Sequence, residues 1–263
     1  MGKADVDIEG VRICYERDGK STEAVRDITF KVADCEFVAL LGPSGCGKTT
    51  LLHAVGGLVP ISEGSIRCGG RNVSGPGPER VMVFQEQSLL RWRTVKSNIE
   101  FALECKRVPK AERFATVHRL IEQIGLQHRS NAYPFELSGG MKQRVAIARA
   151  LAYDADVLLM DEPFGALDAQ TKLTMQSLLL DIWQSSRKTV LFVTHDIDEA
   201  IFLADRIVIM TRGPGRINAE IAVNAQRPRS REFLVSDLFL GTKRQVFNVI
   251  NDAEHENGNG VAR

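Results

Sequence analysis

The chain has 263 residues, of which 44% are hydrophobic and 25% are charged, as in ordinary globular proteins. With 34 Lys and Arg against 33 Asp and Glu, its formal net charge is +1, which gives no reason to expect nucleic acid or an anionic membrane surface as a partner. No apolar run approaches the roughly 18–20 residues that span a bilayer. These values argue against a membrane-spanning, secreted, fibrous or disordered protein.

Short apolar runs alternate with helical patterns along the chain, which predicts an α/β fold with a largely parallel sheet. The region around residues 12–39 has the pattern of antiparallel strands joined by a polar hairpin at 18–21. Residues 36–41 are predicted to form a buried strand that leads through a glycine-rich turn into a helix at about 48–55. Further strands are expected at 81–84, 156–161, 189–194 and 206–210.

Between about residues 88 and 152 the pattern becomes helical, and an inserted α-helical subdomain is expected there. Within it, residues 110–124 have the three-to-four spacing of an amphipathic helix. The apolar face of that helix is expected to carry Phe114, Val117, Leu120, Ile121 and Ile124.

The chain is expected to divide after about residue 227, where Arg227-Pro228 ends the α/β pattern. Residues 1–227 would form one nucleotide-binding domain, and residues 228–263 a helical tail. The tail has one amphipathic stretch at about 231–251, and its polar end from residue 255 is predicted to be disordered.

The five cysteines are odd in number, widely spaced and never arranged as C-x-x-C, which argues against a disulfide framework or a zinc site. Reduced and mostly buried thiols in a cytoplasmic protein are expected instead. Cys46 has no neighbouring base and is expected to fill space rather than act as a nucleophile. The five residues are Cys14, Cys35, Cys46, Cys68 and Cys105.

A glycine-rich segment fits the pattern G-x-x-x-x-G-K-[ST] and lies between a predicted strand and a predicted helix. Glycines let backbone N–H groups surround phosphate oxygens, and a helix N-terminus adds partial positive charge. Lys48 is placed to reach the β- and γ-phosphates, and the Thr49 hydroxyl to ligate Mg²⁺. A plain connecting turn is the alternative, which the Lys-Thr pair at this offset disfavours. The predicted phosphate-binding residues are Gly42, Pro43, Ser44, Gly45, Cys46, Gly47, Lys48, Thr49 and Thr50.

Two acidic residues end the apolar strand predicted at 156–161. The carboxyl edge of a parallel sheet is where α/β proteins bind ligands. Asp161 suits coordination of Mg²⁺ through water, and Glu162 suits the polarisation of an attacking water as general base. A solvated acid pair at a strand end is the simpler interpretation of this motif alone, and the phosphate loop makes the functional one preferable.

A second candidate anion site opens the helix that follows Leu137. Ser138 is a natural N-cap, and Gly139 and Gly140 allow a close backbone approach to an anion. An ordinary capped helix start is the alternative for Ser-Gly-Gly in isolation. Kinases, GTPases and transport ATPases all carry phosphate loops, so this segment helps to discriminate among them.

Taken together, these motifs resemble the ATP-binding subunits of ABC transporters over about residues 6–225. Residues 137–144 match the family's signature motif, between the phosphate loop and Asp161-Glu162. Gln85 resembles the Q-loop glutamine, residues 166–168 (ending in Asp168) the D-loop, and His195 the switch histidine. Tyr15 resembles the aromatic residue that stacks on adenine, with packing on an N-terminal strand as its alternative.

The resemblance implies a fold, a reaction and a second copy of the chain. The fold would be a P-loop NTPase core with a mostly parallel sheet, an N-terminal antiparallel β subdomain and an inserted helical subdomain. ATP and Mg²⁺ would be bound, with Thr49, Gln85 and Asp161 at the metal. Ser138, Gly139 and Gly140 would contact the ATP of the other protomer in a head-to-tail dimer. The implied catalytic residues are Glu162, His195, Lys48 and Gln85.

Several stretches are most similar to importer ATPases for nitrate, sulfonate, taurine and related small anions, among them 76–80, 89–95 and 213–217. Arg91 departs from that group, which usually carries proline there. The implied partners are an integral membrane permease and, indirectly, a periplasmic or extracellular solute-binding protein. The chain would then lie at the cytoplasmic face of the cell membrane. Trp92 is a candidate for contact with the permease or for packing within the helical subdomain.

Other classes fit the motifs less well. A soluble ABC-type ATPase acting on nucleic acid or ribosomes usually joins two cassettes or inserts long coiled coils, and the balanced charge disfavours it. A phosphotransferase such as a small-molecule kinase leaves residues 137–144 unexplained. A catalytically inactive binding module is expected to lack Glu162 or His195, and both are present.

Overall fold

Two sheets form the body of the protein in the computed structural model, which describes residues 4–17, 19–165 and 167–258. The larger sheet has six strands in the order β10-β9-β3-β8-β7-β6, and the smaller has the order β2-β1-β4-β5. The larger sheet consists of β3 (Phe37–Leu41), β6 (Arg80–Val83), β7 (Val157–Asp161), β8 (Thr189–Thr194), β9 (Arg206–Met210) and β10 (Ile217–Ala222). The smaller consists of β1 (Val6–Arg17), β2 (Lys20–Val32), β4 (Glu63–Cys68) and β5 (Arg71–Asn72).

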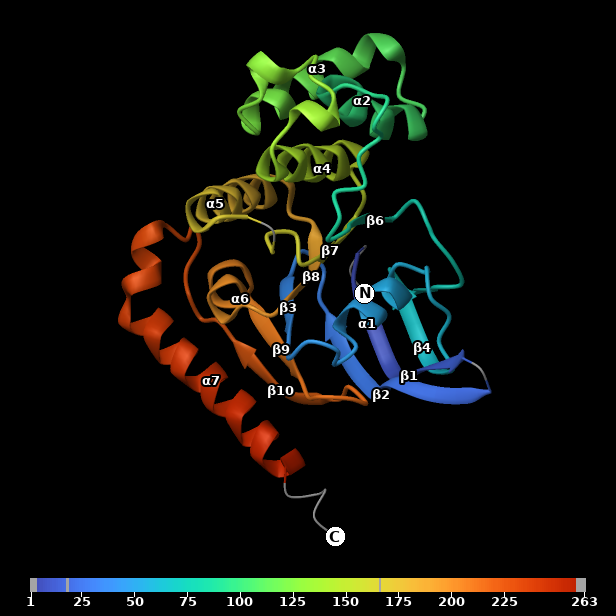
Figure 1. The fold of residues 1–263 in the computed structure, drawn as a ribbon, viewed down its shortest axis with the longest axis vertical. Helices are drawn as coiled ribbons and strands as arrows, with labels where there is room; N and C mark the ends of the chain where they lie inside the picture. Colours follow the sequence, from blue (N-terminus) through green and yellow to red (C-terminus); the bar gives the residue numbers. More distant parts are fainter. Residues whose placement is uncertain (1–3, 18, 166, 259–263) are drawn as a thin grey trace.

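Five neighbouring strands of the large sheet are parallel, and β10 pairs antiparallel with β9 at one edge. The register places Leu41 of β3 opposite Thr194 of β8, and Asp161 of β7 opposite Val193 of β8. The carboxyl ends of these strands therefore lie at one level, and the loops that follow them meet at one edge of the sheet (Figure 1). This mostly parallel arrangement confirms the predicted α/β fold.

Successive side chains of a strand point to opposite faces of the sheet. Along β3 all of them are apolar and buried, so both faces of the large sheet are covered. Phe37, Ala39 and Leu41 point into a cluster with α5 (Ala169–Ser186) and α6 (Ile197–Leu203). Val38 and Leu40 point into a second cluster with α1 (Lys48–Val55) and the small antiparallel sheet. Because apolar residues face both sides, these strands are continuous hydrophobic runs, which is why the sequence identified them.

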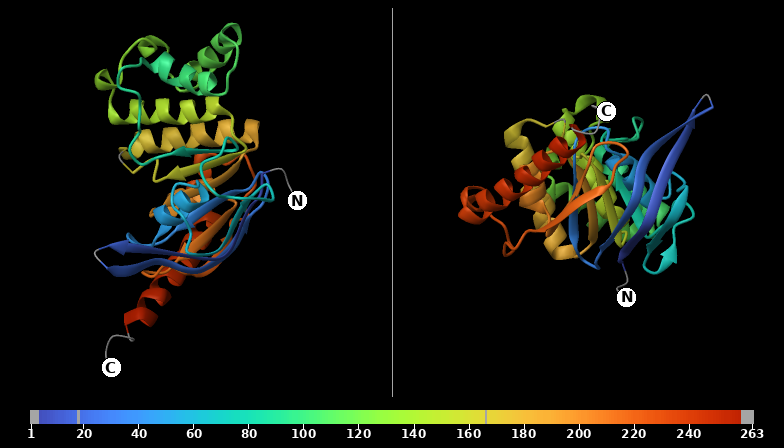
Figure 2. Two further views of the ribbon diagram at one scale, coloured as in Figure 1. Left: turned by 90° about the vertical axis from the view of Figure 1, so that its right-hand side faces the viewer. Right: turned by 90° about the horizontal axis from the view of Figure 1, so that it is seen from below.

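The helices α2 (Val95–Cys105), α3 (Lys110–Gln123) and α4 (Gly139–Tyr153) pack around a third hydrophobic cluster. They lie at one end of the molecule, and the last turns of α7 (Asp237–Gly258) lie at the other (Figure 2). Short 3₁₀ turns occupy Gln127–Arg129, Pro134–Glu136 and Arg231–Val235. Within the described ranges no helix is both long and apolar enough to cross a membrane.

Phe114 does not belong to the buried face that the sequence predicted for α3. Its side chain is 64% exposed, whereas Val117, Leu120, Ile121 and Ile124 are buried. The other four residues confirm the spacing, but Phe114, in the first turns of the helix, contacts α2 at its polar surface, where the Lys96 ammonium lies 5.7 Å from the centre of its ring. It also lies against His118, with a ring-to-ring distance of 5.9 Å.

Two further expectations differ from the structure. Helix α7 continues to Gly258, into the segment predicted to be disordered from residue 255, because extending a nucleated helix costs little. Residues 259–263 lie outside the described ranges.

The cysteines are less buried than the sequence predicted. All five are free thiols, but only Cys46 and Cys68 are buried, and Cys105 is exposed. The predicted hairpin residue Asp18 is also outside the described ranges.

Candidate functional site

Most of the polar residues singled out by the sequence follow the carboxyl ends of parallel strands. The phosphate loop follows β3, Asp161 ends β7 with Glu162 directly after it, and His195 follows β8. Gln85 follows the neighbouring strand β6 and is exposed. The parallel register therefore collects in one place residues that are far apart in sequence.

The phosphate loop ends at Gly47, the N-cap of α1, which has a φ of 92° that favours glycine. Lys48 is 5% exposed and folds back onto the loop. Its ammonium group donates to the carbonyl oxygens of Gly42 at 2.7 Å and Pro43 at 2.9 Å. The lysine is thus held at the loop by neutral acceptors, which a phosphate with full negative charge can replace.

Cys46 is fully buried inside this loop, and its Sγ lies 3.8 Å from the Lys48 ammonium. Burial raises the pKa of the Cys46 thiol, although the neighbouring lysine opposes that shift. The thiol therefore stays protonated near neutral pH and is a poor nucleophile. This agrees with the expectation that Cys46 fills space.

Thr49 and Asp161 meet at the start of α1. The Thr49 hydroxyl donates to Asp161 Oδ1 at 2.9 Å. Burial raises the pKa of Asp161, and the hydrogen bond from Thr49 opposes the shift. A hydroxyl and a carboxylate, with the Gln85 amide following the adjacent strand, form the kind of oxygen donor set that Mg²⁺ prefers.

His53 was not identified from the sequence. It lies in the last turn of α1, and its Nε2 is 4.0 Å from Asp161 Oδ2. This nitrogen is buried and has no hydrogen-bond partner among the described residues. A histidine one turn from the phosphate loop carries no distinctive sequence signal, so its contact with Asp161 emerges from the fold alone.

Glu162 and His195 form a direct pair across two neighbouring strands. His195 Nδ1 lies 3.1 Å from Glu162 Oε2, and the two side chains are 57% and 19% exposed. Glu162 has a φ of 39°, an uncommon conformation for a residue with a side chain. The strand therefore ends in a sharp turn at Glu162, whose carboxylate is directed to the histidine.

Tyr15 lies on β1 beside the start of α1. Its hydroxyl lies 3.4 Å from the Thr50 hydroxyl oxygen, and its side chain is 43% exposed. An accessible ring face next to the phosphate loop agrees with the predicted stacking on adenine, and that role remains a prediction.

The residues around Ser138 lie apart from this group. Ser138 caps α4, accepting from the backbone N–H of Met141 at 3.3 Å, and α4 lies with α2 and α3 on one side of the molecule, away from α1 (Figure 1). A Cβ on Gly139 would meet open space, whereas one on Gly140 would lie 3.0 Å from Thr171 Cγ2. Gly139 is therefore free to approach an anion, and Gly140 also has an internal packing role.

Asp168 is the N-cap of α5, and its carboxylate accepts from the Thr171 N–H at 3.0 Å. Hydrogen bonding from Thr171, first from its side chain and then from this N–H, lowers the pKa of Asp168. Ala166, part of the predicted D-loop, lies outside the described residues.

Gly215, which the sequence did not mark as a site residue, supports the phosphate loop from behind. It follows the fifth parallel strand, β9, and a Cβ on it would lie 1.9 Å from the carbonyl oxygen of Cys46. Its N–H donates to Ala24 O at 3.0 Å, and its carbonyl accepts from the Arg26 N–H at 2.9 Å. The sequence shows a glycine-rich turn here, but its contact with the loop depends on the sheet.

Gly215→Ala is expected to displace the Cys46 carbonyl and with it the phosphate loop. Overpacking of this kind costs about 1–3 kcal/mol, so nucleotide affinity should fall about 5- to 160-fold. Isothermal titration of ATP onto the purified variant measures this directly.

Gly213→Ala is the matched control, because a Cβ there meets nothing within 4 Å. It should bind ATP as the unmodified protein does. Unchanged affinity in Gly215→Ala would show that the contact with Cys46 does not hold the loop in its binding conformation.

Comparisons with known proteins agree with this arrangement. A family model described as ABC transporter matches residues 25–165. The chain is 46% identical over 250 residues to an uncharacterized ABC transporter ATP-binding protein of Methanocaldococcus jannaschii, MJ0412, covering 95% of this chain and 92% of that protein. It is 47% identical over 204 residues to the taurine import ATP-binding protein TauB of Escherichia coli K12, covering 78% and 80%.

Solved structures give the same result. A dimeric structure of MJ0796, a bacterial ABC transporter cassette, matches with a TM-score of 0.76 and 29% identity over 84% of this chain and all of that one. A dimeric post-hydrolysis state of MJ0796 bound to ADP and Pi matches with a TM-score of 0.75, at the same identity and coverage. The chain therefore belongs to the ABC transporter family and is one of its ATP-binding subunits.

Proposed function

We propose that this chain is a Mg²⁺-dependent ATPase that works as a head-to-tail dimer and energises a membrane importer of taurine or a related small anion. The observation that carries the proposal is the meeting, at one sheet edge, of the phosphate loop, the Thr49–Asp161 pair and the Glu162–His195 pair. Each pair supplies a different part of phosphoryl-transfer chemistry.

The phosphate loop would bind the triphosphate. Backbone N–H groups at the start of α1 and its helix dipole favour anions there. Lys48 would exchange the carbonyl oxygens of Gly42 and Pro43 for phosphate oxygens, which are stronger acceptors because they are charged. Tyr15 would stack on adenine.

Thr49, Asp161 and Gln85 would hold Mg²⁺, with Asp161 acting through water. The ion, when bound, supplies positive charge to the phosphate oxygens. Burial of Asp161 raises its pKa, so the Thr49 hydrogen bond has the role of keeping the carboxylate in its charged form. Hard oxygen donors at the end of a rigid strand suit this task.

Glu162 would take a proton from the attacking water, and His195 would orient it. A proton on His195 Nδ1 makes that nitrogen a donor to Glu162 Oε2, at the observed 3.1 Å. When both ring nitrogens are protonated, Nε2 can donate to a γ-phosphate oxygen as well. The histidine would thus connect the base to the group being transferred.

Ser138 and Gly139 would complete the site of a second copy. The start of α4 is exposed and presents backbone N–H groups at a helix N-terminus. The helix as a whole is held in place by packing against α2, α3 and β6. An isologous head-to-tail dimer would bring this terminus to the partner's nucleotide and Asp168 to the interface. ATP binding would close the dimer, and hydrolysis would allow it to open.

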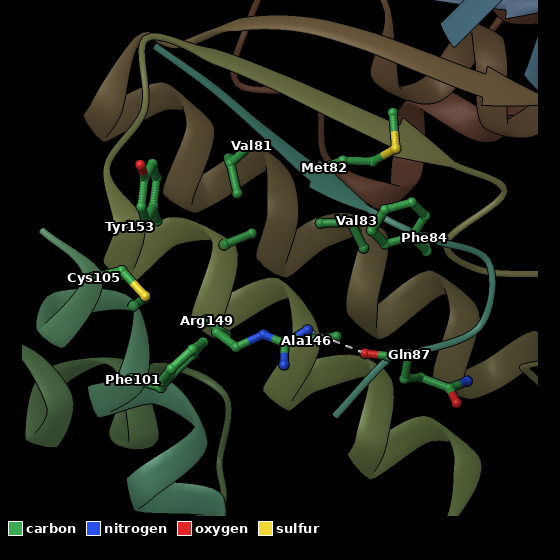
Figure 3. Close-up of a pocket in the computed structure, with 12 residues that line it drawn as sticks. Val81, Met82, Val83, Phe84, Gln87, Phe101, Cys105, Ala146, Arg149 and Tyr153 are labelled. Carbon is green, nitrogen blue, oxygen red and sulfur yellow. Dashed lines mark hydrogen bonds between the residues drawn. The ribbon is translucent and has the colours of Figure 1, made fainter. Parts of the chain in front are cut away.

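The permease would dock beside the segment that follows Gln85. A pocket of about 230 Å³ opens between β6, α2 and α4, and Arg149 crosses it to donate to the carbonyl oxygens of Ser88 and Gln87 (Figure 3). Its lining is mainly apolar and would receive apolar side chains of the permease. The lining residues are Val81, Met82, Val83, Phe84, Gln87, Phe101, Ala102, Cys105, Ala146, Arg149, Ala150 and Tyr153.

Exposed aromatic side chains lie on or beside the segment that follows Gln85. Trp92 is 73% exposed, which favours contact with a partner over packing within the helical subdomain. Asn98 holds its loop by bonding to Leu90 and to the carbonyl oxygens of Arg93 and Thr94. Phe135, 78% exposed, stacks on Tyr133 at 5.7 Å. A hydrogen-bonded loop that presents tryptophan to solvent supports docking of a membrane partner at the cytoplasmic side.

Glu162→Gln is expected to bind ATP, form a stable dimer and turn over about 10²- to 10⁴-fold more slowly, because the amide keeps the shape but cannot accept the proton. Light scattering with and without ATP and Mg²⁺, together with phosphate release, measures both effects. Lys48→Ala is the control that should fail to bind ATP. Full hydrolysis by Glu162→Gln would remove glutamate from the role of base.

Deletion of the gene is expected to abolish uptake of radiolabelled taurine and other sulfonates, as the 47% identity to TauB suggests. Re-expression of the unmodified chain should restore uptake, and re-expression of Glu162→Gln should not. Loss of nitrate uptake with sulfonate uptake intact would assign the transporter to a different anion. Unchanged uptake of all these anions would contradict the proposed importer.

A further inference from the structure

Lys172 joins two segments that meet beside the Glu162–His195 pair. It lies in the first turn of α5, where its N–H donates to Asp168 O at 2.8 Å. Its ammonium group lies 2.7 Å from Asp196 Oδ2 and 2.7 Å from Glu199 Oε1. One lysine therefore ties the start of α5 to the segment that carries His195.

The two carboxylates bound by this lysine hold the backbone on both sides of His195. Asp196 caps α6 by accepting from two N–H groups of its first turn at 2.9 and 3.2 Å. The second oxygen of Glu199 accepts from the Thr194 hydroxyl at 2.5 Å. The same hydroxyl oxygen accepts from the Asp196 N–H at 3.0 Å. Both neighbours of His195 thus belong to one hydrogen-bonded network.

Lys172 is the cation on which this network depends. The Glu199 side chain is 4% exposed, and burial raises its pKa despite the lysine and the Thr194 hydroxyl. A carboxylate buried in this way needs a charged partner, and removing the partner leaves it uncompensated. Lys243 lies nearby on α7, but it pairs at 2.7 Å with Asp198 on the more exposed side of α6.

We infer that Lys172 is a positioning residue for ATP hydrolysis, which fixes the backbone around His195 and so sets the contact of its Nδ1 with Glu162. It acts through Asp196 and Glu199. Because Asp168 caps the start of α5, the ion pairs also connect the segment proposed to face the second copy with the histidine. This inference rests on the proposed function, since it concerns the geometry of the same reaction.

Replacement of Lys172 separates positioning from binding. Lys172→Met, of similar length without charge, is expected to lower kcat about 10- to 100-fold, the range typical of a small misplacement of a reacting group. The KM for ATP should stay within about twofold, because Lys48 and the phosphate loop are untouched. Lys172→Arg restores the cation and should recover most of kcat.

Lys243→Met is the matched control. It removes a lysine whose ion pair is also made to α6, at 2.7 Å, but to Asp198. Its kcat and KM should equal those of the unmodified protein. Carbon-13 spectra of histidine-labelled protein provide the structural readout: the His195 ring signal, assigned with His195→Ala, should shift or broaden in Lys172→Met and not in Lys243→Met.

The kinetics of these variants can contradict the proposed role of Lys172. A kcat within about twofold of the unmodified protein in Lys172→Met would overturn the inference, as would an equal loss in Lys243→Met. If Lys172→Met does not fold, Thr194→Val breaks the link from Glu199 to the strand end without changing charge, and an unchanged kcat there would also overturn it. An unmodified protein without ATPase activity would instead contradict the proposed function.

Discussion

The site depends on one constraint, the parallel register of five neighbouring strands. Because β6, β7, β8, β3 and β9 run in the same direction, their carboxyl ends meet at one edge of the sheet. Each end supplies a different component: Gln85, the acidic pair, His195, the phosphate loop and the Gly215 turn. Any change in register would separate these groups, so the hydrophobic strands position the chemistry, although Asp161 at the end of β7 is the one residue of these five strands with a proposed role in it.

The same constraint explains why packing around the edge is so tight. Gly215 leaves no room for a side chain against Cys46, and Gly47 leaves none against Ala24, whose carbonyl oxygen would lie 2.8 Å from a Cβ. The phosphate loop is therefore enclosed by backbone from β2 and from the turn after β9. On the other side, the ion pairs of Lys172 hold the segment after β8. Rigid supports on both sides suit a site that must place charges before the substrate arrives.

Sequence reasoning identified the parallel strands and the phosphate loop because both have local signals. The predicted strands at 189–194 and 206–210 and the helix at 48–55 coincide with β8, β9 and α1, since a doubly buried strand is a continuous apolar run. It did not predict the exposure of Phe114 or the contacts of His53, Gly215 and Lys172. Each of these depends on which elements become neighbours, and a single sequence does not specify the distance between segments that are far apart along the chain.

In the proposed head-to-tail dimer, one chain would hold only part of its active site. Mixing a variant blocked at its own phosphate loop, Lys48→Ala, with one blocked at the helix terminus, Ser138→Arg, tests this most directly. Neither variant alone should hydrolyse ATP. In a head-to-tail dimer of the two, one site combines an intact phosphate loop with an intact Ser138, so the mixture should regain activity. Hydrolysis by Ser138→Arg alone, or no recovery in a mixture shown to form mixed dimers, would contradict the account.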